Sequence, residues 1–521
     1  MKTRNDTHQK LPTLDAGASN ALSLLVEENA SLKDELQKLT QQLDWFKRQL
    51  FGQKSEKKDF TDNPYQATIA DLLKELPSLP EKKEKNVLDG SPEGSQLRFD
   101  ESVPVEEIHI NAPELKGKNK DDYSVIGKKI HYRLAQTPAS FVVLKYITQT
   151  VKKKSTKAIV SSSATNAVFE KSLADVSFLA GMLVDKFIYH QPLYRQHQRL
   201  ENNGVLLARS TLTNLVKRSI ELLTPIYHCQ LGHILQSQIL AIDETPIKAG
   251  KAKKGKLKQS YFWPIMGEHN EICFTYSSSR AMQHLKNQLR EDFNGTILSD
   301  GYKAYDLYAA SVDGVTTAKC WIHCRRYFEQ CENYEPEHAQ TALAYIGRLY
   351  EIEAIIKAKN FEGEQKLLYR LEKGKSVVDA FFKWVYEKRL DPELLPSNPL
   401  SKALRYAQNQ EQGLREFLSD PNLPMDTNHV ERALRCIAMG RRNWLFCWSE
   451  LGAEHVGIIQ SLLSTCRLHD VNPYDYLVDV LQRVNIHPAN KVVQLTPRLW
   501  KDNFGDNPLR SDLFKRHQGI I

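Results

Sequence analysis

The sequence predicts a multidomain α+β protein that begins with a coiled coil. Its 521 residues exceed what one ordinary hydrophobic core requires, so several domains are expected. Apolar residues recur with a heptad period over residues 22–50, which is typical of a coiled coil. Between residues 236 and 330, short apolar runs alternate with helical patterns, which indicates an α/β domain.

The composition excludes two classes of protein. No run of eighteen apolar residues occurs, so no membrane span is expected. The first ten residues, MKTRNDTHQK, lack the apolar core of a signal peptide. The eight cysteines include no CxxC pair, which predicts reduced thiols and a cytoplasmic protein.

Residues 20–52 form the predicted coiled coil. Leucine fills most of the a and d positions, and Asn29 is the one polar residue at an a position. A single buried asparagine favours a parallel, in-register dimer. The alternative is a long amphipathic helix that packs on its own chain. The predicted dimerisation residues are Leu25, Asn29, Leu32, Leu36, Leu39 and Leu43.

Two segments of different character follow the coiled coil. Residues 76–122 are rich in Pro, Gly, Ser and mixed charge, which predicts a linker. Residues 123–165 alternate apolar and polar residues, which predicts a small β segment. The second half of the segment carries three successive lysines that either form a solvated face or lie along DNA phosphates. These lysines are Lys152, Lys153 and Lys154.

Residues 168–230 are predicted to be helical and similar to a helix-turn-helix. Gly204 separates the last two helices, and Ser210 or Thr211 could cap the second one. The second helix of such a pair enters the major groove of DNA, but helix pairs of this kind are also common in bundles. The basic residues expected to contact DNA are Arg209, Lys217 and Arg218.

Carboxylates follow two apolar runs in the segment 236–330. Asp243 and Glu244 come directly after Ile239–Ile242, and Asp300 comes shortly after Thr296–Leu298. The predicted order is three strands, a helix, a strand, a helix and a strand. This order fits a mixed sheet in which the first and fourth strands are neighbours. Asp243 and Asp300 would then face each other at one edge of the sheet.

Two carboxylates at one sheet edge repel each other unless a cation lies between them. Mg²⁺ prefers oxygen ligands, and a third carboxylate would allow two ions to bind, as in phosphodiester displacement. The candidate for that third carboxylate is Glu431, which lies among Arg432, Arg435, Arg441 and Arg442. These arginines would face the phosphate backbone. The alternative is a structural role, in which Glu431 forms a capping box with Asn428 and an ion pair with Arg435.

The chain resembles a bacterial DDE transposase of insertion-sequence family 66. The resemblance covers nearly the whole chain and is carried by the blocks RQLFGQKSEK, AIDETPIK, LSDGYKAY, KCWIHCRRYF, KALRYAQNQ and MDTNHVERALRCIAMGRRNWLF. It implies an RNase H-like catalytic domain in which Asp243, Asp300 and Glu431 are both the catalytic residues and the metal ligands. The core would occupy residues 236–330 and 423–485, with an all-α insertion at 331–422 and a C-terminal tail at 486–521.

The resemblance also implies cofactors and partners. The enzyme would use two Mg²⁺ ions, for which Mn²⁺ can substitute. Its DNA partners would be the terminal repeats of the element and the target DNA. The protein would act as a homodimer or higher oligomer, with accessory proteins encoded by the same element, and would be nucleoid-associated in the bacterial cytoplasm.

Two features concern cysteine. Several transposases of this fold carry a Cys-x-x-His similar to the one at Cys320–His323; we expect Cys320 and Trp321 to pack in the core and His323, Arg325 and Arg326 to lie near DNA. Relatives often carry a zinc ribbon before the helix-turn-helix, but residues 107–165 contain no cysteine. No zinc is therefore expected: either the packing of this segment suffices to hold it together, or the segment is a degenerate form of that ribbon.

Three functions fit the sequence. The first is a DNA transposase that cuts the element ends and joins their 3′-hydroxyls to target DNA. The second is a catalytically inactive DNA-binding dimer, which would use the coiled coil and the basic segments. The third is an RNase H-like, structure-selective nuclease without strand transfer. The three acids in their matching motifs favour the transposase.

Overall fold

The computed structural model describes residues 97–520, apart from short gaps at 100–102, 111–122, 138–139, 155–156, 158, 162–166, 171, 254–255, 290–292, 445–446 and 448. The predicted coiled coil lies outside the described residues, as does most of the predicted linker. The chain divides into two compact units. The helical unit contains Cys324–Ile352 and Ser376–Asn409, and the sheet unit contains residues 97–323, Glu353–Lys375 and 410–520.

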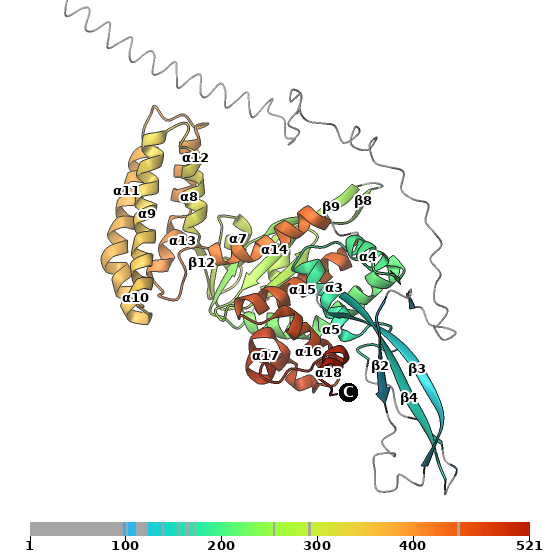
Figure 1. The fold of residues 1–521 in the computed structure, drawn as a ribbon. Coiled ribbons are helices and arrows are strands. Elements are labelled where there is room, and N and C mark those ends of the chain that lie inside the picture. The colour runs from blue at the N-terminus through green and yellow to red at the C-terminus, as the bar shows by residue number, and fades with distance from the viewer. Residues whose placement is uncertain are drawn as a thin grey trace, which may run out of the picture. The chain divides into compact units, whose positions relative to one another are not determined.

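A mixed sheet with the order β10-β9-β7-β11-β12 forms the centre of the sheet unit, and β8 pairs with β9 (Figure 1). The strands β7, β11 and β12 are parallel, whereas β9 is antiparallel to β7, β8 and β10. The strands of this sheet are β7 (Ile239–Ile242), β8 (Thr245–Lys253), β9 (Lys256–Met266), β10 (Ile272–Ser277), β11 (Gly295–Ser299) and β12 (Val315–Lys319). Helices α6 (Met282–Leu289) and α7 (Lys303–Ala309) connect the later strands.

The expected neighbour relation between two strands is confirmed. β7 and β11 pair in parallel, with Leu298 opposite Ala241. β8 was not predicted, because its sequence TPIKAGKAK has lysines and small residues where strands usually carry β-branched or aromatic side chains.

Helix α15 (Glu450–Leu468) covers the edge strand β10. Gly457 allows this close approach, since a Cβ atom there would lie 2.5 Å from the Phe274 carbonyl oxygen. The Ser461 hydroxyl then accepts the Phe274 N–H at 2.8 Å, and the Thr465 hydroxyl accepts the Ile272 N–H at 3.2 Å. The polar residues of this apolar helix therefore satisfy backbone groups that an edge strand would otherwise leave unpaired.

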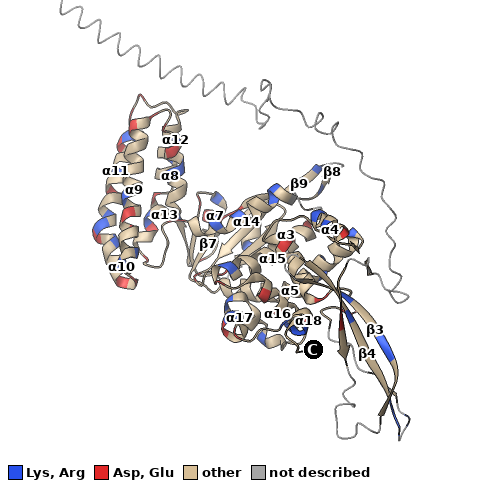
Figure 2. Cartoon of the chain, viewed as in Figure 1, with Lys and Arg blue, Asp and Glu red and all other residues tan. Residues whose placement is uncertain are grey.

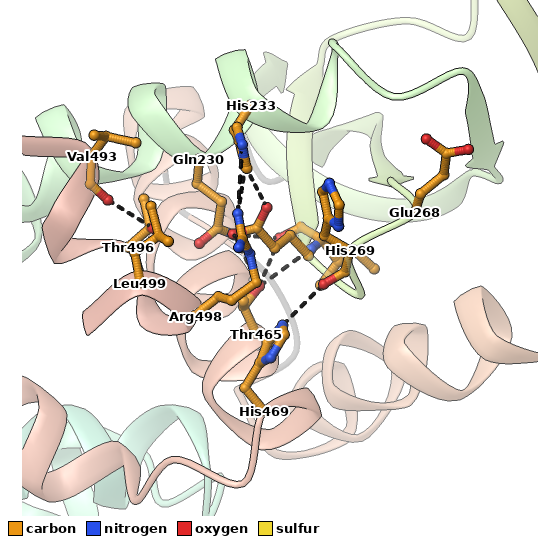
Figure 3. A network of polar contacts seen from close by, with 12 residues as sticks. Gln230, His233, Glu268, His269, Thr465, His469, Val493, Thr496, Arg498 and Leu499 are labelled. Carbon is orange, nitrogen blue, oxygen red and sulfur yellow. Dashed lines mark hydrogen bonds and ion pairs between the residues drawn. The ribbon is translucent and has the colours of Figure 1, made fainter. Parts of the chain in front are cut away.

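A buried ion-pair network fixes the C-terminal region to the sheet unit (Figure 3). The Glu271 side chain is 1% exposed and lies 2.8 Å from His233 Nδ1 and 3.3 Å from Arg498 Nε. His233 stacks on His269, whose carbonyl oxygen lies 3.1 Å from His469 Nε2. These contacts join α5 (Arg209–Ile234), the β9–β10 turn, the end of α15 and α17 (Pro497–Phe504).

A second, smaller sheet has the order β2-β4-β3, with β5 also paired to β4. Its strands are β2 (Val105–Ile110), β3 (Tyr123–Thr137), β4 (Ser140–Lys153) and β5 (Ile159–Ser161). β2 lies inside the range that we expected to be linker. That expectation was wrong for this stretch, because Ile108 is buried against β4 despite the charged residues around it.

Apolar packing and the C-terminal helix hold the small sheet together. Ile108, Leu144 and Tyr146 form a buried cluster with Leu513 of α18 (Asp512–His517). The Tyr146 hydroxyl donates a hydrogen bond of 2.9 Å to Asp512 of the same helix. The described part of the sheet thus has an apolar core of its own.

The predicted helix-turn-helix region contains α3 (Val176–Phe187), α4 (Leu193–Asn202), the short strand β6 (Val205–Leu206) and α5. β6 pairs with β1 (Arg98–Phe99). Gly204 adopts a positive φ of 80° between the helices, as its place in the sequence indicated. The expected capping residues were wrong, because α5 begins at Arg209 and Ser210 and Thr211 lie inside its first turn. The second half of α5 packs against β10 and α15.

The helical unit is built around aromatic residues. Phe381 contacts Phe328, Tyr345 and Trp384 through tilted or edge-to-face ring pairs. Its helices are the larger parts of α8 (Trp321–Glu329), α9 (Pro336–Ala358) and α11 (Lys375–Arg389), together with α12 (Pro399–Asn409). The remaining helices are α10 (Gly363–Tyr369), the π-helix η3 (Arg370–Gly374), α13 (Glu411–Arg415), η4 (Glu416–Leu418), α14 (Asn428–Trp444), α16 (Pro473–Arg483) and η5 (Ala489–Leu495).

Candidate functional site

Asp243 and Asp300 lie at the same edge of the central sheet. Each follows the carboxyl end of its strand, Asp243 directly after β7 and Asp300 directly after β11. These two strands are adjacent and parallel, so the chain continues from both of them at the same edge. The expectation that the two aspartates sit at neighbouring strand ends is therefore met.

The pKa of Tyr305 is raised in part by both aspartates. Burial, followed by the nearby carboxylates of Asp300 and Asp243, raises the pKa of Tyr305 well above its usual range. The Tyr305 hydroxyl donates a hydrogen bond of 2.6 Å to Glu244 Oε2. Tyr305 is fully buried and packs edge-on against Trp263.

Arg280 neutralises part of this negative charge. Its guanidinium group donates to Glu244 Oε1, with an Nε–Oε1 distance of 2.6 Å, and the Glu244 side chain is only 2% exposed. The Arg280 guanidinium lies over the ring of Tyr302, whose backbone N–H donates to Asp300 Oδ1 at 2.8 Å. The Tyr302 hydroxyl in turn donates to the Arg280 carbonyl oxygen at 2.6 Å. These contacts connect the residues after β7 and β11 to the loop before α6.

The beginning of α14 is fixed next to the end of β12. Cys320 follows β12, and its backbone N–H donates to the Ser299 carbonyl oxygen of β11 at 3.0 Å. Its buried Sγ accepts hydrogen bonds from the Thr427 hydroxyl and backbone N–H, at 3.2 and 3.3 Å. Thr427 directly precedes α14, and its carbonyl oxygen accepts the Glu431 N–H at 2.9 Å. Cys320 therefore anchors the helix that carries Glu431.

The Glu431 carboxylate approaches His323, with an Oε1–Nε2 distance of 3.7 Å. His323 lies one turn into α8, three residues after Cys320. In this structure the Cys-x-x-His motif consists of a buried cysteine that holds α14 and a histidine beside its glutamate. Cys320 and Trp321 are both fully buried, as expected, and the Trp321 indole donates to the Leu414 carbonyl oxygen at 2.9 Å.

The capping-box alternative for Glu431 loses its first partner. Asn428 is the first residue of α14 and not the residue before it. Its side-chain amide donates to Asp426 Oδ2 at 2.8 Å. A capping box requires the first member to lie at the cap and bond to the turn that follows, which is not the position of Asn428.

The arginines of α14 fall into two groups. Arg432, Arg435 and Arg442 are exposed. Arg441 is partly buried and donates to the Pro246 carbonyl oxygen of β8, and its burial lowers the pKa of the guanidinium. Three of the four predicted phosphate-contacting arginines are thus accessible, while Arg441 ties α14 to β8.

The other residues predicted to contact DNA lie on different elements. Lys152 and Lys153 are on β4, directly before Lys154, and Arg209, Lys217 and Arg218 are on α5. The two α5 arginines stack on aromatic rings, Arg209 on Tyr194 and Arg218 on Phe169, and Lys217 pairs with Glu221. Arg325 and Arg326 belong to the helical unit, where Arg325 donates to Glu329 at 2.7 Å.

The oxygen ligands at the sheet edge are of the type that hard divalent cations prefer. Within the part of the chain that the structure describes, however, no three His, Cys, Asp or Glu side chains lie close enough together to hold a metal ion. The carboxylate oxygens of Asp243, Asp300 and Glu431 are thus of the kind that bind magnesium, but these side chains do not form a preassembled metal site.

The supporting residues Tyr305, Arg280 and Thr427 were not predicted from the sequence, and neither was the burial of the Glu244 side chain. Tyr305 lies in the block LSDGYKAY, five residues after Asp300, and this short spacing is a signal that could have been used. Arg280 and Thr427 lie in loops with no periodic pattern. Their roles depend on contacts between segments far apart in the sequence.

Three family comparisons match the chain. The family described as "Transposase IS66 family" matches residues 171–455, more than half of the chain. The "IS66 C-terminal element" matches residues 461–498, and "Transposase C of IS166 homeodomain" matches residues 38–108. The last match overlaps the predicted coiled coil and linker and indicates a homeodomain-like N-terminal region.

Similar proteins occur in Sinorhizobium fredii (strain NBRC 101917 / NGR234). The uncharacterized protein y4hP is 28% identical over 404 residues, which cover 73% of this chain and 72% of y4hP. The uncharacterized protein y4jD is 27% identical over 360 residues, which cover 66% of this chain and 69% of y4jD. Among the described residues, no helix is both long and apolar enough to span a membrane.

Proposed function

The chain belongs to the IS66 transposase family, and on this basis we propose that it is a DNA transposase that cuts the ends of its insertion sequence and joins the 3′-hydroxyls to target DNA. The observation that carries the proposal is the pair of aspartates after the adjacent parallel strands β7 and β11. The sheet order supports an RNase H-like core, interrupted by the helical segment between Asp300 and Glu431.

In this proposal Asp243, Asp300 and Glu431 are the catalytic residues and hold two Mg²⁺ ions, which Mn²⁺ can replace. When bound, these ions supply the activation of a water or 3′-hydroxyl and the stabilisation of the leaving oxygen. The protein residues position the carboxylates: Tyr302 through its N–H to Asp300, and Cys320 through its contacts to the start of α14. His323 beside Glu431 would lie near the scissile phosphate and hold a proton or a hydrogen bond there.

DNA would be held by the exposed arginines of α14 and by basic residues on other elements. Three exposed arginines lie on one face of α14, the helix that carries Glu431. They are Arg432, Arg435 and Arg442. Contacts to phosphate position the duplex and contribute little sequence selectivity. The proposed further contacts, to element ends or target DNA, come from Lys152, Lys153, Lys154, Arg209, Lys217, Arg218, Arg325 and Arg326.

Substitution of the three acids tests the proposal. Asp243→Asn, Asp300→Asn and Glu431→Gln keep the size of each side chain and remove its charge. Each should lower cleavage of DNA that carries the element ends by about a hundredfold or more, because preorganised charge at the reacting phosphate is lost. Binding of the same DNA should persist.

The matched control is Asp313→Asn, at an exposed position before β12. It removes one negative charge from the sheet unit and should leave cleavage unchanged. If Glu431→Gln cuts element ends at nearly the wild-type rate, Glu431 is a structural residue and the proposed triad is wrong.

Two other functions are tested by the same experiments. A structure-selective nuclease would cleave DNA but would not join a supplied 3′-hydroxyl end to target DNA. A catalytically inactive DNA-binding dimer would bind the ends and show no metal-dependent cleavage. The three acids in their family context favour the transposase over both.

A further inference from the structure

A hairpin made by β8 and β9 carries an unusual run of positive charge. Residues 245–267 contain six lysines and no aspartate or glutamate. Figure 2 shows Lys and Arg along this hairpin. None of these residues was predicted to bind DNA. The lysines are Lys248, Lys251, Lys253, Lys254, Lys256 and Lys258.

The strand pattern places five of these lysines at the surface, and Lys254 lies outside the described residues. In β8, Ile247 and Ala249 are buried, whereas Lys248, Lys251 and Lys253 are exposed. In β9, Lys256 and Lys258 are exposed as well. The apolar side chains of the hairpin thus anchor it, and the cationic ends of the lysines face solvent. Lys258 has a partial counterion in Glu450, at 3.8 Å.

Two positive charges oppose each other at the end of the hairpin and disfavour its strand pairing. Lys253 and Lys256 are direct cross-strand partners. Like charges in directly opposed positions of an antiparallel pair destabilise the pair. A polyanion next to both side chains would convert this repulsion into attraction. The arrangement therefore indicates an anionic partner at the end of the hairpin.

The other end of the hairpin is fixed at the candidate site. β8 begins at Thr245, two residues after Asp243. Its Lys248 carbonyl oxygen accepts the Cys447 N–H at 2.9 Å, and Arg441 of α14 donates to the Pro246 carbonyl oxygen. The hairpin and the arginine-bearing helix α14 are thus directly connected beside the carboxylate edge.

We propose that the β8–β9 hairpin binds the phosphate backbone of duplex DNA next to the carboxylate site. A two-stranded ribbon fits a DNA groove, and a series of exposed lysines neutralises successive phosphates without reading bases. The inference rests on the proposed function, because that function supplies the DNA. It adds a contact surface that extends from Asp243 along the duplex flanking the scissile phosphate.

The test compares two triple variants that lose the same charge. The hairpin variant carries Lys251→Gln, Lys253→Gln and Lys256→Gln. The control carries Lys357→Gln, Lys375→Gln and Lys491→Gln, at exposed positions elsewhere in the sheet unit. Binding to duplex DNA of arbitrary sequence is measured in EDTA over a range of salt concentrations, so that no cleavage occurs.

The measured slope is that of the logarithm of the binding constant against the logarithm of the salt concentration. Its magnitude falls by about 0.9 for each phosphate contact that is lost, so in the hairpin variant it should fall by roughly 2 to 3. The control should lose less than about 1 in slope, since its lysines would touch no phosphate. A second triple variant with arginine at the same three hairpin positions should restore the wild-type slope. The thermal midpoint of the glutamine variant should equal or exceed that of the wild type, because the repulsion between Lys253 and Lys256 is removed.

A wild-type slope in the folded hairpin variant would overturn the inference. A loss of slope equal to that of the control would overturn it too, because the effect would then be one of net charge. The failure of the proposed function looks different. In that case Asp243→Asn would cut element ends normally, whatever the salt dependence of the hairpin variant.

Discussion

Glu244 shows how one buried carboxylate alters the candidate site. Because adjacent side chains at a strand end point apart, the sequence predicts that replacement of Glu244 costs much less activity than replacement of Asp243. The Glu244 side chain is 2% exposed and accepts hydrogen bonds from both Tyr305 and Arg280. The Glu244 backbone N–H also donates to Asp243 Oδ1 at 2.7 Å, so Glu244 is part of the framework around that aspartate.

Replacement of Glu244 by Gln should therefore have a measurable but partial effect. The amide can still accept the Tyr305 hydrogen bond, but it loses the ion pair with Arg280. Because Arg280 is partly exposed, the loss should destabilise the protein by about 1 kcal/mol. Cleavage should fall by less than it falls for Asp243→Asn, and more Mg²⁺ should be needed for half-maximal cleavage.

Tyr305→Phe is the companion variant to Glu244→Gln, because it removes only the hydroxyl that donates to Glu244. It should shift the Mg²⁺ requirement in the same direction. Equal loss of cleavage in Glu244→Gln and Asp243→Asn would contradict a positioning role and would make Glu244 a direct ligand.

The individual residues whose positions could be predicted are those set by the local pattern of a strand or by residue type. Asp243 and Asp300 could be predicted because an acid after an apolar run lies at the rim of a sheet. Burial of Cys320 and Trp321 could also be predicted from residue type. Arg280 and Tyr305 could not, because their partners lie in segments that only the folded sheet brings together.

Among the elements, the segment that leads into α14 receives several hydrogen bonds from one buried arginine. Arg370 is 1% exposed and lies in the π-helix η3, a type of helix that is often found at functional sites. Its guanidinium forms two hydrogen bonds with Glu353, at 2.7 and 2.9 Å. It also donates to the carbonyl oxygens of Phe417, Asp420 and Leu423, all within 3.0 Å.

These three carbonyl groups precede Met425 and Thr427, which position α14. Arg370→Met should therefore destabilise the protein by about 3 kcal/mol or more, because a carboxylate and three carbonyl groups each lose the hydrogen bonds that Arg370 donates. Cleavage should fall even at temperatures well below the melting temperature, because Glu431 is no longer held in position. Thermal unfolding and single-turnover cleavage measure the two effects.

Lys373→Gln, on the same π-helix but exposed, is the control for Arg370→Met and should change neither quantity. Arg370→Lys keeps the charge but cannot form all five hydrogen bonds, so it should fall between the wild type and Arg370→Met. An unchanged melting temperature in Arg370→Met would show that the segment is held by other contacts.

Elements with strong periodicity were predicted well, and those shaped by tertiary contacts were not. The pairing of β7 with β11 followed from the order of apolar runs. β8 was missed because its lysines mask its alternation, and β2 was missed because Ile108 is buried among charged residues. The N-terminus of α5 was misplaced because Ser210 and Thr211 lie in its first turn and neither caps it.

At the scale of the whole molecule, the predicted dimerisation depends on residues that the structure does not describe. The heptad over residues 22–50, with Asn29 as its one polar a position, predicts a parallel dimer. Two protein copies would allow one transposase assembly to hold two element ends. The family match over residues 38–108 overlaps this segment and indicates a homeodomain-like region, so the coiled coil stays a prediction.

The mass of the protein in solution tests this prediction. At micromolar concentration the intact chain should be dimeric, and a chain that starts near residue 60 should be monomeric, because it lacks the heptads. Leu32→Lys with Leu39→Lys introduces charge at two d positions and should also give a monomer. The matched control, Ala30→Lys with Gln37→Lys, adds the same charge at outward-facing b positions and should remain dimeric. A monomeric intact chain would refute the coiled coil, whereas an equally dimeric shortened chain would move the association to the rest of the molecule.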